Sequence, residues 1–66
     1  MMAMRSVRSS FIVAAGYDPD TQIMEVEMTS GRSYTHPNVP PEVYENLLTA
    51  DSPGRFYNDN IKGVYV

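Results

Sequence analysis

The sequence predicts an α+β domain, in which a three-stranded antiparallel β-meander is followed by two short α-helices packed on one face. Three observations lead to this fold class. The chain has 66 residues, which suffices for a single domain over residues 1–66. Apolar side chains alternate with a period of two as far as His36, and from Val39 they recur with the period of a helix. Proline and glycine separate the expected elements, and residues 1–6, which precede the first strand, are expected to be disordered.

The first half of the chain is expected to form the three strands. They cover residues 9–17, 22–29 and 33–36. Residues 18–21 are typical of a turn, because aspartate side chains hydrogen-bond nearby backbone amides and proline fixes its own φ. A second turn is expected at residues 30–31, and the third strand ends at Pro37, which cannot donate to the ladder.

The register of the third strand decides which face of the sheet carries its rings. Two sets alternate along the second strand: Met24, Val26 and Met28 in one, Glu25 and Glu27 in the other. A two-residue turn at 30–31 would put Tyr34 and His36 on the glutamate face, whereas a three-residue loop would put them on the methionine face. We favour the two-residue turn, which predicts both rings on the solvent-exposed face.

The second half of the chain is expected to form two amphipathic helices. The first runs over residues 40–50, and its apolar stripe consists of Val43, Tyr44, Leu47 and Leu48. The second begins after Ser52-Pro53, a typical helix start, and ends near Gly63. Residues 64–66 either pair as an edge strand or pack against the domain. The predicted core consists of Ile12, Val26, Met28, Val43, Leu47 and Ile61.

Composition narrows the function classes. Eight acidic and five basic side chains give a net charge of −3, which counts against strong autonomous binding to nucleic acid. The chain has no cysteine and therefore neither disulfides nor a thiolate metal site. The longest apolar run, residues 11–15, is far shorter than the roughly 20 residues of a membrane helix. We expect a cytoplasmic protein that does not contact a membrane.

Residues for catalysis are sparse. The single histidine has no cysteine or serine-based partner motif. Glu25 and Glu27 share a strand face about 7 Å apart, which is better explained as the polar face of an amphipathic strand than as a carboxylate pair. Asp18 and Asp20 fit a turn better than a calcium loop. We therefore expect no enzyme, no metal ion and no cofactor.

The rings of the third strand are the candidate ligand-binding residues. Under the favoured register, Tyr34 and His36 form a platform on which bases or a peptide can stack. Arg32 at the adjacent turn and Arg55 supply positive charge. The same aromatic residues are also common in plain cores, so both interpretations remain open.

An ordered set of segments and single positions runs through the chain. It consists of Val7-Arg8-Ser9-Ser10, Ala15-Gly16-Tyr17-Asp18-Pro19, Met24-Glu25-Val26-Glu27-Met28, Gly31, Tyr34, Val39-Pro40, Val43-Tyr44, Leu47, Ala50, Ser52, Gly54, Phe56-Tyr57-Asn58 and Ile61. Over residues 5–65 this set resembles the KTSC domain, a family named for the C-terminus of some lysyl-tRNA synthetases that also occurs as free-standing bacterial and phage proteins. The family's hallmark is a Tyr-x-Tyr motif, and Tyr34-Thr35-His36 carries histidine in place of the second tyrosine.

Three functions remain open at this point. The resemblance implies a non-enzymatic binding module that contacts RNA weakly. The alternative is an adaptor for protein–protein interaction, which includes a homodimer that uses a sheet face or an edge strand. A carboxylate-based enzyme is the third.

Overall fold

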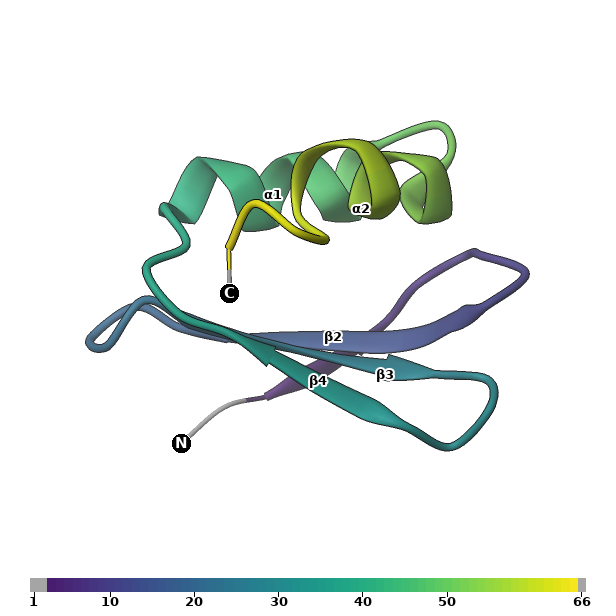
Figure 1. Ribbon diagram of the computed structural model, residues 1–66, viewed down its shortest axis with the longest axis horizontal. Coiled ribbons are helices and arrows are strands. Elements are labelled where there is room, and N and C mark those ends of the chain that lie inside the picture. Colours follow the sequence, from purple (N-terminus) through teal and green to yellow (C-terminus); the bar gives the residue numbers. More distant parts are fainter. Residues whose placement is uncertain (1–2, 66) are drawn as a thin grey trace.

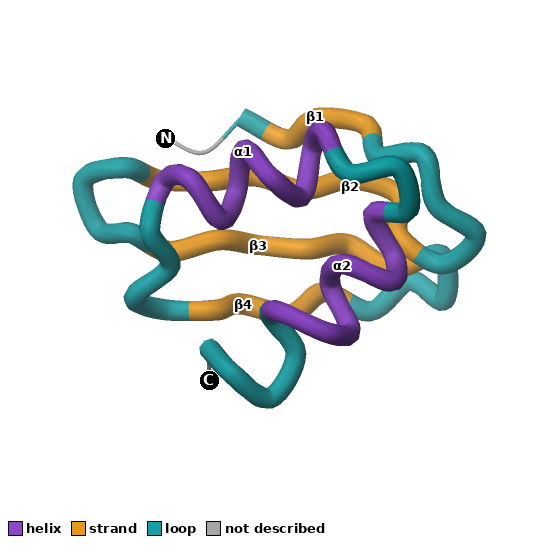
Figure 2. The backbone as a smooth tube through the Cα atoms, turned by 90° about the horizontal axis from the view of Figure 1, so that it is seen from above, coloured by secondary structure: helices purple, strands orange, loops and turns teal. Residues whose placement is uncertain are grey.

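The computed structural model describes residues 3–65 as one sheet covered on one face by two helices (Figure 1). The elements are β1 (Met4–Ser6), β2 (Ile12–Asp18), β3 (Ile23–Met28), β4 (Ser33–His36), α1 (Pro41–Thr49) and α2 (Pro53–Asn60). The sheet is antiparallel, with strand order β1-β2-β3-β4. Seen from above, α1 lies over the β1–β2 side and α2 over the β3–β4 side (Figure 2). The predicted α+β architecture is confirmed, with four strands in place of three.

The additional strand lies at the start of the chain. Met4–Ser6 pairs with β2, and Met4 lies opposite Gly16. All three residues of β1 are exposed, and the segment lacks the alternation of apolar and polar side chains that predicts a half-buried strand. Backbone pairing with β2 creates it. The expectation of disorder over residues 1–6 is therefore wrong for the strand, while residues 1–2 lie outside the described residues.

The turn between β3 and β4 corrects the predicted register. Glu27 lies opposite Ser33, which leaves a loop of one residue more than expected. The Gly31 amide donates to the Met28 carbonyl at 3.0 Å, and the Met28 amide donates to the Arg32 carbonyl at 2.8 Å. Gly31 has a φ of 93°, the left-handed conformation that ends a three-residue hairpin loop.

This register moves both rings of β4 to the other face of the sheet. Tyr34 lies opposite Val26 and His36 opposite Met24, on the face that the helices cover. The prediction of a solvent-exposed platform is therefore wrong. Two-residue and three-residue loops both use a glycine with positive φ, so the Ser-Gly signal at residues 30–31 does not separate them.

The core lies between the sheet and the two helices. Its largest fully buried side chains are Ile12, Met24, Val26, Val39, Leu47 and Ile61. Burial of four predicted core residues is thus confirmed. Met28 and Val43 are only half-buried and pack against the edge of the core. Met28 is the last residue of β3.

Beyond α2 the chain turns back toward the sheet. The amides of Val64 and Tyr65 both donate to the Ile61 carbonyl at 3.0 Å, so this segment forms a turn. Of the two expectations for the tail, packing is confirmed for Tyr65, which lies against the core, whereas Val64 is exposed and Val66 lies outside the described residues. Among residues 3–65, no helix is long and apolar enough to cross a membrane.

Candidate functional site

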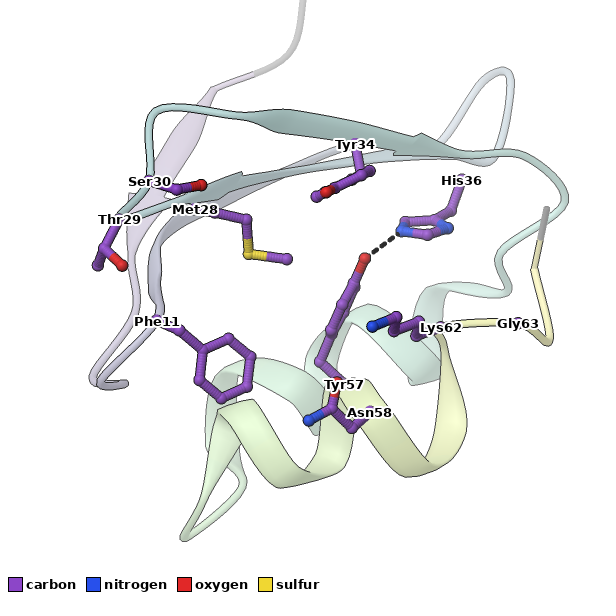
Figure 3. A pocket seen from close by; sticks show the side chains of 10 residues that line it. All are labelled: Phe11, Met28, Thr29, Ser30, Tyr34, His36, Tyr57, Asn58, Lys62 and Gly63. Atoms are coloured by element: carbon purple, nitrogen blue, oxygen red, sulfur yellow. Dashed lines mark hydrogen bonds between the residues drawn. The ribbon is translucent and has the colours of Figure 1, made fainter.

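A pocket of about 410 Å³ opens between the β3–β4 end of the sheet and α2 (Figure 3). Most of its wall is aromatic or apolar, from Phe11, Met28, Tyr34 and Tyr57. Its polar side chains are Thr29, Ser30, His36, Asn58 and Lys62. Ligand sites range from about 300 to 1,000 Å³, so a single nucleotide or one or two amino-acid side chains would fit here.

One wall of the pocket depends on a glycine at the start of α2. A Cβ at Gly54 would lie 2.6 Å from the Phe11 ring and 2.8 Å from the Ser9 hydroxyl. Such contacts are shorter than van der Waals distances, so glycine is what lets the helix approach the loop before β2. Phe11, the last residue of that loop, thereby packs against α2 and faces the pocket (Figure 3).

His36 joins three parts of the chain. Its side chain is buried, with Nδ1 2.6 Å from the Tyr65 carbonyl oxygen and Nε2 2.8 Å from the Tyr57 hydroxyl. The ring of Tyr57 meets the imidazole edge-on, with centroids 5.4 Å apart. These contacts tie β4 to α2 and to the tail that follows it.

The two hydrogen bonds assign the imidazole tautomer. A carbonyl oxygen can only accept, so Nδ1 of His36 carries the proton and donates to Tyr65. In the neutral ring Nε2 is then an acceptor, and the Tyr57 hydroxyl donates to it. Both ring nitrogens are therefore engaged within the protein.

The lining of the pocket carries a positive charge although the chain is acidic. Among the described residues that line it, Lys62 carries the sole charge, and none of the acidic side chains is present. Burial raises the pKa of Tyr57, and the nearby Tyr34 phenol raises it further. The Tyr57 hydroxyl therefore keeps its proton at neutral pH.

The structure brings together some of the predicted site residues and separates others. Tyr34 and His36 both line the pocket, on the helix-covered face. Arg32 stands just before β4 and does not line the pocket. Arg55 points away on α2, with its side chain 84% exposed and its Nε 3.9 Å from a carboxylate oxygen of Asp59.

Of the residues that line the pocket, the sequence analysis named only Tyr34 and His36 as site residues, and the most informative ones that it missed are Tyr57 and Lys62. Tyr57 has helical spacing on an apolar stripe, a pattern typical of a core residue, and it does pack in the core while its hydroxyl meets His36. Lys62 follows α2 and had no local signal. Within residues 3–65, no three His, Asp or Glu side chains lie close enough together to hold a metal ion.

Comparisons with known proteins agree on one family. The model of the KTSC domain matches residues 8–65. A crystal structure of a KTSC domain protein from Yersinia pestis superposes with a TM-score of 0.96 at 35% identity, covering 100% of this chain and 93% of that one.

Relatives of two lengths match the chain. A protein of Tsukamurella paurometabola is 51% identical over 59 residues, which are 89% of this chain and 88% of that protein. A lysine–tRNA ligase of a Nostoc species is 41% identical over 56 residues, which are 85% of this chain but 10% of the ligase.

Proposed function

This chain belongs to the KTSC domain family, and we propose that it is a non-enzymatic binding module that takes one base of single-stranded RNA into the pocket between β4 and α2. One observation carries this proposal. An aromatic-lined pocket of nucleotide size holds a single positive charge, Lys62, in a chain whose net charge is −3. Polyanions bind where positive charge gathers locally.

The aromatic lining suits a base. Proteins read single-stranded RNA through unpaired bases that stack on aromatic side chains. Tyr34 is 42% exposed at the pocket, so part of its ring surface is open to a ligand. Such a stack contributes roughly 1–3 kcal/mol per base, which one pocket converts into weak binding.

Charge placement is compatible with a phosphate backbone at the pocket mouth. Lys62 is exposed there, and Arg32 follows the turn that forms one end of the pocket. Glu25 and Glu27 lie on the opposite face of the sheet, where they do not oppose the phosphates directly. The affinity is expected to be weak and to fall with added salt.

Two further points support the class of function. The match to part of a lysine–tRNA ligase supports RNA as the ligand. The absence of catalysis is proposed because His36, the one imidazole, uses both nitrogens to hold β4, α2 and the tail together. We place the module in the cytoplasm, where a cysteine-free chain has no need of disulfides.

A protein-interaction adaptor is the second candidate, and strand order favours it. β4 is an edge of the sheet, so its outer backbone groups are open to pairing with another strand. Exposed Tyr34 lies on that edge strand beside the pocket. A peptide or a second copy of the chain could pair there and insert a side chain between β4 and α2.

NMR titration of the labelled protein with short single-stranded RNA tests the proposal. We expect shifts confined to the pocket residues, and about tenfold weaker binding for Tyr34→Ala from the loss of one stack. Lys62→Ala should weaken binding and flatten its salt dependence, while Arg55→Ala, a matched loss of one exposed cation outside the pocket, should change little.

Two results would count against RNA. Unchanged spectra at millimolar RNA remove it as the ligand. Shifts that instead appear along β4 with a peptide, or on raising the protein concentration, would leave the adaptor in front.

A further inference from the structure

We infer that the pocket selects bases with an amino group at the position farthest from the sugar, adenine and cytosine over guanine and uracil, because Tyr57 offers a buried acceptor there. This inference rests on the proposed function and adds a specificity-determining residue to it. Tyr57 is 2% exposed, and its hydroxyl lies between Tyr34 and His36 in Figure 3.

The direction of the hydrogen bonds decides what Tyr57 can offer. The Tyr65 carbonyl requires a proton on Nδ1 of His36, so in the neutral imidazole Nε2 accepts the hydroxyl proton of Tyr57. A phenol has one proton and lone pairs on its oxygen, so the oxygen that remains for a ligand is an acceptor. The tail thus sets, through His36, the polarity that the pocket presents.

The shape and chemistry of the pocket decide which edge of a base meets Tyr57. Ribose and phosphate are polar, so they stay at the mouth with exposed Lys62 and Asn58. The base enters with the atoms farthest from the sugar in front. At that position adenine and cytosine carry an amino donor, while guanine and uracil carry a carbonyl oxygen.

The other polar groups of the pocket do not set the same preference. Thr29, Ser30, Tyr34 and Asn58 are exposed, so they reorient or bind water with either kind of base, and exposed Lys62 stays with the phosphate at the mouth. The Tyr57 hydroxyl is buried and already committed to His36, so it cannot turn its proton toward a carbonyl without leaving Nε2 unpaired. A wrong base therefore loses a hydrogen bond and places two acceptors together.

Binding of matched RNA hexamers measures the selectivity. Cytidine is compared with uridine, and adenosine with inosine, which replaces the amino group by a carbonyl. We expect the amino-bearing member of each pair to bind about tenfold more tightly at neutral pH. Tyr57→Phe should abolish the ratio. Tyr44→Phe, which removes a buried hydroxyl bonded to the Ala15 carbonyl, should preserve it.

Each outcome separates the inference from the function on which it rests. Equal or reversed binding within the pairs, with RNA still bound at the pocket, overturns the assignment of Tyr57 and leaves the proposed function standing. A ratio that survives in a folded Tyr57→Phe variant overturns it too. Failure of every hexamer to bind removes the proposed function and this inference with it.

Discussion

Tyr44 on α1 and Tyr57 on α2 show how the two halves of the domain differ. Both side chains are buried, and each hydroxyl donates a hydrogen bond to a residue of the sheet. Tyr44 stacks on Tyr17, with ring centroids 5.1 Å apart, and its hydroxyl reaches a backbone carbonyl. Tyr57 meets His36 edge-on and lines a pocket instead.

The difference lies in what each helix covers. On the α1 side, the Tyr17 hydroxyl donates to the Val39 carbonyl at 2.6 Å, which anchors that ring against Tyr44. On the α2 side, β4 is a short edge strand and Tyr34 remains 42% exposed. The two halves of the same layer architecture therefore differ: a smaller hollow of about 290 Å³ between β1 and α1 has no aromatic side chain in its lining, whereas the α2 half has an aromatic-lined pocket.

Leu47→Ala should have the largest effect, because this side chain is fully buried in the core that both halves share. The expected loss is about 2–5 kcal/mol, comparable to the entire stability of so small a domain. Thermal unfolding followed by circular dichroism measures it. A variant that melts within a few degrees of the parent would show that the core does not depend on α1.

A pair of hydroxyl deletions tests the comparison directly. Tyr57→Phe should cost about 1–3 kcal/mol, because Nε2 of His36 stays buried without its donor. Tyr44→Phe should cost less than about 1 kcal/mol, because its hydroxyl lies 3.4 Å from the Ala15 carbonyl, at the long limit of a hydrogen bond. Urea unfolding gives both values. Equal losses would remove the distinction between the halves.

A smaller effect is expected where α2 approaches the loop before β2. Gly54→Ala introduces a Cβ 2.6 Å from the Phe11 ring, which overpacks that wall. The net loss should be about 1–2 kcal/mol, after a helix-propensity gain of up to about 1 kcal/mol. Adding Phe11→Ala should cost less than the two single changes together, since it removes the clash. Strict additivity would show that the ring does not limit the helix.

The elements that the sequence predicted correctly are those with a periodic pattern of apolar side chains. The alternation through Met24, Val26 and Met28 marks β3, and the stripe with Leu47 marks α1. Other features depend on contacts between distant residues. β1 exists because β2 pairs with it, and the Tyr57–His36 bond spans 21 residues. Which face of the sheet carries Tyr34 depends on whether the β3–β4 loop has two or three residues, and the Ser-Gly pair does not specify that length.

The smallest expected effect concerns alkaline pH. Burial raises the pKa of both Tyr44 and Tyr57. In the unfolded chain these phenols ionise near pH 10, whereas in the folded domain they keep their protons to higher pH. Above about pH 10 the unfolded state therefore binds fewer protons than the folded state, so stability falls as pH rises. Below that pH their contribution is constant.

Urea midpoints on either side of about pH 10 measure this loss, and tyrosinate absorbance follows the ionisation itself. Each Tyr→Phe variant should lose less stability at high pH than the parent, because it has one buried phenol fewer to ionise on unfolding. Tyr57 adds a specific consequence, since its ionisation removes the proton that it donates to Nε2 of His36. The β4–α2 contact should then loosen along with global stability. Hydrogen exchange of the Tyr57 and His36 backbone amides measures this loosening, once the rates are corrected for the intrinsic effect of pH. If the protection of these amides is the same at high and at neutral pH, the Tyr57 hydroxyl does not hold β4 and α2 together.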